Sequence, residues 1–292
     1  MKPLYISVDI GGTTIQLAAS KTGEQVDEML EFELASYETP ALWLEYLFDK
    51  NPRFKGANWV VGVPGSVKKN RQLLETPNLP SAWAGSCIPD ALSLFNINWL
   101  LENDANLAAF GEACCGAGVK YFHQICLTLG TGLGAGIIID GKIYRGASGA
   151  AGELGHLQIE PGGRECGCGS RGCLETYASV SGLKRTYFEL TGSWLSGREI
   201  AEKVETDEFA AVALRKTGLW LGRGLAQIIN ILEPQAVIFA GGLSRSLDLL
   251  LPHIKESSRP LLFARRTEKT PLLRSKLKYP ALQGGLKLAA TG

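Results

Sequence analysis

Two segments that lie about 120 residues apart follow one plan, and this repetition limits the folds open to the chain. The first, YISVDIGGTTIQLAASKTGEQ, begins at Tyr5 and runs as a β-rich stretch, a Gly/Thr turn, a second β-rich stretch and a Thr-Gly turn. The second, QICLTLGTGLGAGIIIDGKIY, begins at Gln124 and closes on an Asp-Gly turn. Turns of this composition between apolar runs are typical of hairpins. The sequence therefore predicts two domains built on one plan, which suits a length of 292 residues.

Helical patterns lie between and after these hairpins. The first begins on a Thr cap followed by Pro, and its Leu42 and Tyr46 recur at helical spacing. Helices are expected over residues 39–50, 207–234 and 280–292, with a buried strand and a Gly-Gly turn over 235–244. The pattern indicates a mixed α/β protein.

The composition is that of an ordinary protein near neutrality, with 30 basic and 29 acidic residues. It gives no support to a nucleic-acid or membrane partner. No secretory signal is recognisable at the N-terminus, and no apolar run approaches the roughly 18 residues of a membrane span. We expect a cytoplasmic protein, in which the seven cysteines form no disulfide framework. Basic residues crowd positions 255–278, where a solvated face and a phosphate-attracting patch both stay open.

Three glycine-rich turns are candidates for phosphate binding: VDIGGTTI, LGTGLGAG and the AGGLS of residues 240–244. Glycine lets backbone N–H groups approach a phosphate, and threonine hydroxyls add donors. The first turn is no Walker A loop, since no Gly-Lys-Ser/Thr follows, and no dinucleotide fingerprint, since a strand follows instead of a helix. Taken alone it is equally a plain hairpin turn. Two such hairpins together favour a site that grips a polyphosphate.

Polar groups suited to sugar hydroxyls gather in two motifs. ENDANLAAFGE places Asn103 and Asp104 at a predicted helix start, where the residues act either as ordinary caps or, for Asp104, as a general base that the helix dipole keeps ionised. GELGH brings Glu153 and His156 together, and Glu175 follows the cysteines. Carboxylates, an imidazole and an amide are the groups that hydrogen-bond a ring of hydroxyls.

The segment GELGHLQIEPGGRECGCGSRGCLE holds three of the seven cysteines within eight residues. His156, Cys166, Cys168 and Cys173 form a Cys3His set, which is the usual design of a structural zinc site. Redox chemistry and inert packing are the alternatives. The remaining thiols are expected in the core: Cys87, Cys114, Cys115 and Cys126.

Together, DIGGTT, GVPGSV, ENDANLAAFGE, TLGTGLGAG, GELGH, CGCGSRGCLE and AGGLS resemble the ROK family of bacterial sugar kinases and repressors, a branch of the actin and hexokinase superfamily. The resemblance runs from about Val8 to the C-terminus. It implies a two-domain actin-like, hexokinase-like (ribonuclease H-like) α/β fold with ATP and sugar in the interdomain cleft, and a homodimer. We place a small domain at residues 1–104 plus 277–292 and a large domain, carrying the zinc loop, at 105–276.

The resemblance also implies roles for single residues. Asp104 would deprotonate the sugar hydroxyl, Asp9 would act near Mg²⁺, and His156 would bind zinc through one ring nitrogen and face the sugar with the other. The other sugar-binding residues would be Gly65, Asn78, Asn103, Glu153 and Glu175. The nucleotide would be lined by Gly11, Gly12, Thr13, Thr14, Thr131, Gly132, Gly241 and Gly242.

The activity implied by the resemblance is ATP-dependent phosphorylation of a hexose, with glucose and glucose 6-phosphate as the leading pair because GGRECGCGSRGCLETYAS is most similar to the glucokinase members. Kinases for N-acetylmannosamine, N-acetylglucosamine, fructose, mannose and allose share these motifs. Polyphosphate as the donor and a non-catalytic sugar sensor are further alternatives. Repressors of the family carry a DNA-binding helix-turn-helix before the DIGGT-like motif; here Asp9 follows eight residues, so we expect the kinase branch.

Overall fold

The computed structural model describes residues 3–69, 71–76, 79–263 and 269–291. By their internal packing these residues form two units. The first unit combines Met1–Lys120, Gly136–Ala151 and Lys276–Gly292, and the second combines Tyr121–Ala135 and Gly152–Ser275. This division differs from the predicted boundary after residue 104. The helix that follows Asp104 packs against the last helix of the chain, and this packing keeps it in the first unit.

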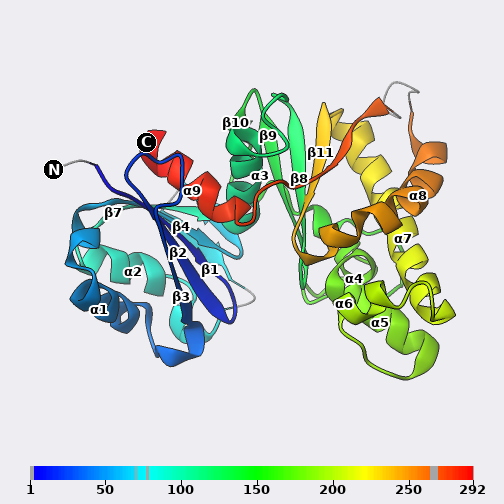
Figure 1. Cartoon of the computed structure of the whole chain (residues 1–292), viewed down its shortest axis with the longest axis horizontal. Helices are drawn as coiled ribbons and strands as arrows, with labels where there is room; N and C mark the ends of the chain where they lie inside the picture. The colour runs from blue at the N-terminus through cyan, green and yellow to red at the C-terminus, as the bar shows by residue number, and fades with distance from the viewer. Residues whose placement is uncertain (1–2, 70, 77–78, 264–268, 292) are drawn as a thin grey trace. The chain divides into compact units, whose positions relative to one another are not determined.

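Five strands form the sheet of the first unit in the order β3-β2-β1-β4-β7 (Figure 1). They are β1 (Tyr5–Ile10), β2 (Thr14–Ser20), β3 (Glu28–Glu33), β4 (Asn58–Val63) and β7 (Asn98–Asn103). The first three form an antiparallel meander, and β4 and β7 extend it in parallel. The predicted hairpin is confirmed, with Asp9 opposite Gln16. A short ribbon, β5 (Ser66–Lys68) with β6 (Gln72–Glu75), accompanies the sheet.

The second sheet repeats this order as β10-β9-β8-β11-β12. Its strands are β8 (Gln124–Leu129), β9 (Leu133–Ile139), β10 (Lys142–Ile143), β11 (Ala236–Ala240) and β12 (Leu272–Arg274). β11 pairs in parallel with both β8 and β12. The two sheets share one order. In each, the three strands that come first in the sequence stand in reverse order, and the two later strands stand beside the first of them. The duplication predicted from the two hairpins therefore extends to the whole strand plan.

The helices of the first unit cover both faces of its sheet. They are α1 (Pro40–Lys50), α2 (Cys87–Leu94), α3 (Asp104–Cys115) and α9 (Pro280–Thr291). Alternate side chains of β4 show why both faces are apolar: Trp59 and Val61 belong to the core with α1 and α2, whereas Val60 packs with Leu107 of α3 and Ala289 of α9. A central parallel strand buried on both sides is typical of α/β sheets.

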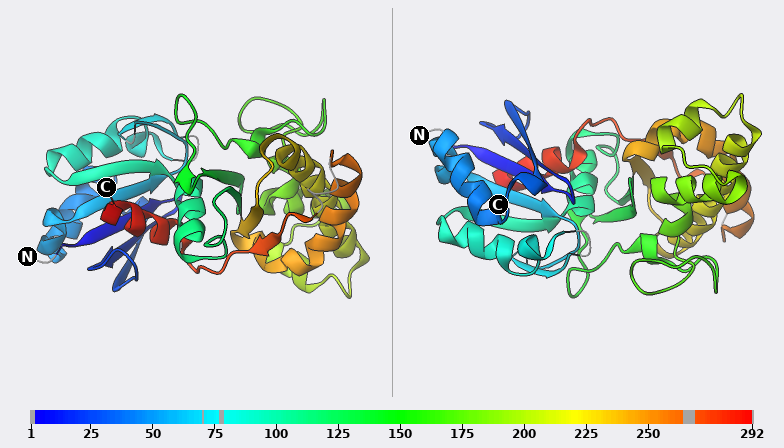
Figure 2. Two further views of the ribbon diagram at one scale, coloured as in Figure 1. Left: turned by 90° about the horizontal axis from the view of Figure 1, so that it is seen from above. Right: turned by 90° about the horizontal axis from the view of Figure 1, so that it is seen from below.

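Close approach of α9 to α3 depends on glycine. A Cβ added at Gly284 would lie 1.9 Å from the carbonyl oxygen of Leu107, and one added at Gly111 would lie 2.1 Å from that of Pro280. The expected final helix is confirmed, and it also packs on β1 although it is last in the sequence (Figure 2). The Gly-Gly pair of this segment therefore serves packing.

The second unit is mainly helical outside its sheet. Its helices are α4 (Glu175–Ala178), α5 (Val180–Thr191), α6 (Gly197–Glu202), α7 (Glu208–Leu232) and α8 (Leu247–Ser258). Its core joins Leu127 and Phe239 of the sheet to Leu183 of α5 and Leu225 of α7. The long helix and the buried strand predicted on either side of Pro234 are both confirmed. None of the helices in the described ranges is long and apolar enough to cross a membrane.

Leu42 and Tyr46, whose spacing predicted the helix α1, are 45% and 46% exposed, and the inward face of the helix carries Trp43, Leu47 and their neighbours. One expectation about buried positions was wrong for three residues. Among the four thiols expected in the core, only Cys126 is buried, while the others are half-buried: Cys87, Cys114 and Cys115.

Candidate functional site

The first candidate phosphate turn joins β1 to β2. Its hydrogen bond from the N–H of Gly11 to the carbonyl of Thr14 measures 2.8 Å, and the carbonyl of Thr13 accepts from Leu34. Gly12 and Thr13 are exposed. The turn thus presents backbone donors and a hydroxyl to solvent, as a phosphate site requires.

Asp9 and Asp104 belong to this same unit. Asp9 lies near the end of β1, and Asp104 follows β7, which runs parallel to β1 with β4 between them. Both side chains are therefore at the carboxyl ends of parallel strands, the edge where α/β sheets bind ligands. Burial, and secondly the nearby charge of Asp104, raise the pKa of Asp9 to about 7. Without a cation, the two carboxyl groups compete for one negative charge.

Asp104 is the first residue of α3, as the sequence predicted. Asn103 caps the helix: its side-chain oxygen accepts from the N–H of Asn106 at 3.0 Å, and its side-chain nitrogen donates to the carbonyl of Gly65 at 3.1 Å. Asn103 and Gly65, two of the residues predicted to bind sugar, are thus brought together. Gly65 has φ of +113°, which favours glycine at this position. Asn78 lies outside the described residues.

The other two glycine turns lie together in the second unit. The turn between β8 and β9 carries Thr131, which is exposed, and Gly132. A Cβ added at Gly241, at the end of β11, would lie 2.7 Å from the carbonyl oxygen of Leu129, directly before that turn. Gly242 faces open space. These two turns therefore form one glycine-lined surface, as a nucleotide-binding function requires.

Glu175 makes a contact that the sequence did not predict. Its carboxylate accepts from the N–H of Leu133 at 2.8 Å, and a Cβ at Gly132 would lie 2.3 Å from the same oxygen. Glu175 therefore links the segment of the cysteines to the turn between β8 and β9. No local pattern indicates this contact, because 42 residues separate the two partners.

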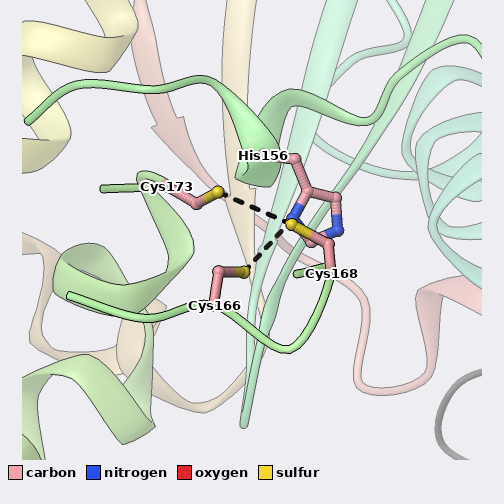
Figure 3. A group of neighbouring side chains, drawn as sticks. All are labelled: His156, Cys166, Cys168 and Cys173. Carbon is pink, nitrogen blue, oxygen red and sulfur yellow. Dashed lines mark hydrogen bonds between the residues drawn. The ribbon is translucent and has the colours of Figure 1, made fainter. Parts of the chain in front are cut away.

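The four predicted zinc ligands are gathered in one cluster (Figure 3). Their ligand atoms all lie within 4.8 Å of one another. The Sγ atoms of Cys168 and Cys173 are 3.7 Å apart, and Cys166 Sγ lies 3.6 Å from His156 Nδ1. A tetrahedral zinc ion with Zn–S bonds of about 2.3 Å and a Zn–N bond of about 2.05 Å would give separations of about 3.8 and about 3.6 Å. The donor set and its spacing fit zinc, whereas 3.7 Å is too long for a disulfide.

The surroundings of the thiols differ. Burial and the adjoining thiols raise the pKa of Cys173 to about 12, while a backbone hydrogen bond at Ser170 lowers the pKa of Cys168. His156 is exposed; its Nδ1 faces the sulfur atoms and its Nε2 lies 3.8 Å from a carboxylate oxygen of Glu153. One imidazole thus presents its two nitrogens to two different groups.

Arg164 holds the cysteine loop in a way that sequence reasoning missed. Its guanidinium donates to the carbonyl of Thr176 at 2.7 Å and to Thr186 Oγ1 at 2.9 Å, pairs with Glu189, and lies over the ring of Tyr177. The backbone N–H of Arg164 donates to the Tyr177 hydroxyl at 2.8 Å. The loop therefore docks on α4 and α5 through one arginine, although it has few apolar side chains. The role of this half-buried arginine cannot be recognised from its position in a glycine-rich stretch.

The predicted site residues thus form two groups, one in each unit. The first unit holds Asp9, the turn at 11–14, Gly65, Asn103 and Asp104; the second holds Thr131, Gly132, Glu153, His156, Glu175, Gly241, Gly242 and the cysteines.

Comparison with known proteins gives consistent results. The ROK family profile matches residues 5–291. The N-acetyl-D-glucosamine kinase of Mannheimia succiniciproducens is 34% identical, over 97% of this chain and 96% of that protein. A crystal structure of a ROK family glucokinase from Streptomyces griseus in complex with glucose and AMPPNP has a TM-score of 0.84 and 32% identity, covering 99% of this chain and 100% of that chain. The predicted two-domain actin-like, hexokinase-like fold is thereby confirmed. The xylose repressor of Bacillus spizizenii is 34% identical over 75% of this chain, which spans 58% of the repressor's length.

Proposed function

The chain belongs to the ROK family, and from that premise we propose that it is an ATP-dependent sugar kinase that phosphorylates a hexose hydroxyl, with glucose as the leading substrate. The observation that carries the proposal is the position of Asp104. It begins α3, in the same unit as the phosphate turn at residues 11–14, and its charge adds to the effect of burial, which is the larger cause of the raised pKa of Asp9. A base and a phosphate turn on one sheet edge are the parts that phosphoryl transfer to a hydroxyl needs.

The proposed mechanism assigns each step to residues of this chain. Asp104 accepts the proton of the sugar hydroxyl while the hydroxyl oxygen bonds to the γ-phosphorus and the bond to the bridging oxygen of ADP breaks. Backbone donors of the turns at 11–14 and 130–132 orient the phosphates. The carboxylate oxygens of Asp9 would suit Mg²⁺, which when bound with ATP would neutralise charge on the phosphates.

We assign the cysteine cluster to a structural zinc ion. Three thiolates and one imidazole would close its coordination shell and leave no open position for chemistry. The Nε2 atom of His156, which lies beside Glu153, would then face the sugar hydroxyls. Glu175, two residues after Cys173, would be held by the same loop.

The relatives do not separate glucose from N-acetylglucosamine, since a kinase of each kind is 32–34% identical to this chain. Purified protein should be given glucose, N-acetylglucosamine, N-acetylmannosamine, fructose, mannose and allose, each with ATP and with polyphosphate. Direct measurement of sugar phosphate detects both donors, and coupled ADP release quantifies the ATP reaction. We expect turnover with ATP, and kcat/KM ranks the sugars.

A non-catalytic sugar sensor is the competing function, and the 34% identity to a xylose repressor is the observation that favours it. The same panel distinguishes the two. Sugar binding by calorimetry without turnover for any donor would refute the kinase proposal and support the sensor. Turnover of one sugar at a rate typical of kinases, about 1–100 per second, would refute the sensor.

A further inference from the structure

Glu102, which directly precedes Asn103 and Asp104, is a carboxylate in the core of the first unit. It is only 1% exposed. One of its oxygens accepts from the N–H of Asn103 and from the side-chain nitrogen of Asn106, each at 3.0 Å. Its other oxygen accepts from Nε of Arg145 at 2.6 Å. A buried charge is unfavourable unless it is paired and hydrogen-bonded, and here both requirements are met.

The two residues that donate hydrogen bonds to one oxygen of Glu102 flank Asp104 in the sequence. Asn103 precedes Asp104, and Asn106 lies two residues after Asp104. One carboxylate oxygen of Glu102 therefore holds the first turn of α3. A carboxylate oxygen of Asp104 accepts from the N–H of Ala105, in that same turn. The direction in which Asp104 points therefore depends on a turn that Glu102 holds.

Arg145 connects this turn to a second segment. The carbonyl of Arg145 accepts from the N–H of Ala151, which closes the loop at residues 145–151. Within it, Gly149 touches β5, since a Cβ there would lie 1.9 Å from the carbonyl oxygen of Val67. Gly65, two residues before Val67, receives the side-chain hydrogen bond of Asn103. The contacts thus form a closed circuit from Glu102 through Arg145, the loop and Gly65 back to Asn103.

We propose that Glu102 and Arg145 are positioning residues, and that the ion pair between the buried Glu102 and the half-buried Arg145 holds the Asn103–Asp104 turn and the loop at 145–151 in the arrangement that proton transfer requires. The proposal rests on the kinase activity proposed above. A misplacement of about 1 Å in a reacting group can lower a rate about a hundredfold. A purely structural ion pair would change stability and leave kcat nearly unchanged.

Glu102→Gln tests the pair because it keeps the shape of the side chain. The amide oxygen of glutamine still accepts from Asn103 and Asn106, while its amide nitrogen meets the Nε donor of Arg145 and breaks that contact. Arg145→Met removes the other partner, and Arg145→Lys restores the charge. The matched control is Glu112→Gln, since Glu112 is equally buried on α3 but accepts from Ala117 and Leu277.

For Glu102→Gln we expect kcat to fall 10- to 100-fold, with the KM for ATP within about twofold of wild type. The kcat of Arg145→Met should fall at least as far, and Arg145→Lys should recover part of this loss. The kcat of Glu112→Gln should stay within about threefold of wild type. In an Asp104→Asn background, Glu102→Gln should change the residual rate less than threefold, because residues that act as a unit are not additive. A kcat within twofold of wild type, an equal loss in both backgrounds, or an equal loss in Glu112→Gln would overturn the proposal.

Amide hydrogen exchange separates failure of this proposal from failure of the kinase assignment. In ligand-free protein, Glu102→Gln should speed exchange at residues 103–106 and 146–151 at least fivefold relative to Glu112→Gln. Wild-type protein without turnover on any sugar would refute the kinase assignment and leave this readout intact. Unchanged exchange in both segments would refute the positioning role itself.

Discussion

Asp9 and Asp104 are two carboxyl groups with different surroundings at the same sheet edge. Asp104 starts a helix, where the dipole favours the ionised form. Asp9 lies within β1, where burial and the charge of Asp104 raise its pKa to about 7. When two carboxyl groups have environments that separate their pKa values, the two groups can take different roles in one site. Asp104 is thus the better base, and Asp9 the group that gains most from a cation.

Asp104→Asn should lower kcat by roughly two to four orders of magnitude, because the amide keeps the shape of the side chain and cannot accept the hydroxyl proton. Sugar affinity measured by calorimetry should remain within a few fold of wild type. The control is Asp90→Asn, an exposed aspartate on α2. A nearly normal kcat in the purified Asp104 variant would remove Asp104 from the role of base.

The raised pKa of Asp9 predicts a pH-dependent stability. In protein free of metal and nucleotide, the folded state keeps a proton on Asp9 up to about pH 7, whereas the unfolded chain loses it near pH 3.8. Stability from this group is therefore complete below pH 3.8 and declines as the pH rises to about 7. Asp9→Asn removes this decline. The free energy of unfolding of the variant, relative to wild type, should therefore be about 1–2 kcal/mol more favourable at pH 8 than at pH 5.

Urea denaturation at both pH values measures the difference. Asp49→Asn, a change of an exposed aspartate on α1, serves as the control and should give the same difference from wild type at both pH values. A gain for Asp9→Asn that shrinks toward pH 8 would have the wrong sign and would contradict the assignment.

Among the elements, the cysteine loop depends on two supports, one shown by its contacts and one proposed. Arg164 docks the loop on α4 and α5, and the Cys3His cluster would be closed by zinc. Since the arginine remains when metal is removed, stripping should loosen the segment between Cys166 and Cys173 rather than the whole loop. Metal-binding free energy would then become local folding free energy.

Cys168→Ser, or prolonged chelation, should therefore weaken sugar binding at least tenfold while changing nucleotide binding less than threefold. Elemental analysis of protein purified without added zinc, with calorimetric titrations of sugar and nucleotide before and after stripping, measures both effects. Cys87→Ser, a change of a half-buried thiol outside the cluster, is the control. Less than about half an equivalent of zinc in active protein, or normal sugar binding after stripping, would sink the zinc assignment.

Gly284 in α9 predicts an outcome opposite to helix propensity. Alanine is a better helix former than glycine by about 1 kcal/mol, yet the added Cβ would overlap backbone atoms of Leu107 and Gly111. Gly284→Ala should lower the free energy of unfolding by about 1–3 kcal/mol through overpacking. Gly56→Ala, where a Cβ meets nothing within 4 Å, should change it by less than about 0.5 kcal/mol. Stabilisation by Gly284→Ala in thermal melts would contradict the described packing.

The sequence was informative wherever local chemistry decides structure. Turn residues and apolar runs predicted β1, β2, β8 and β9, and caps predicted α1 and the start of α3. The spacing of Leu42 and Tyr46 predicted a helix but not its buried face, because Trp43 and Leu47 have the same spacing and only tertiary packing selects between the two faces. The contacts of Arg164 and Glu175 join residues far apart in the chain, so no spacing rule reveals them. The cysteine cluster was predictable because its ligands lie close in sequence.

At the scale of the whole molecule, residues proposed to bind sugar are divided between the two units. Asn103 and Asp104 belong to the first unit, whereas Glu153, His156 and Glu175 belong to the second. A hexose held by all of them would restrict the units to one arrangement and exclude water from the phosphoryl group. Small-angle scattering should then give a smaller radius of gyration with sugar, in wild type and in Asp104→Asn alike. An unchanged radius at saturating sugar would indicate a rigid site.

Because α9 is the last element of the chain, its position affects the order in which the two units can be completed during synthesis. The ribosome synthesises β1, β4 and α3 first, but the helix that covers them comes after the whole second unit. At about 5–20 residues per second, α3 waits on the order of ten seconds for its partner. Val60 and Leu107, which pack with Ala289, stay uncovered on the nascent chain during that interval. The second unit can thus finish folding before the first, whose apolar face between β4 and α3 is completed only when α9 has been made.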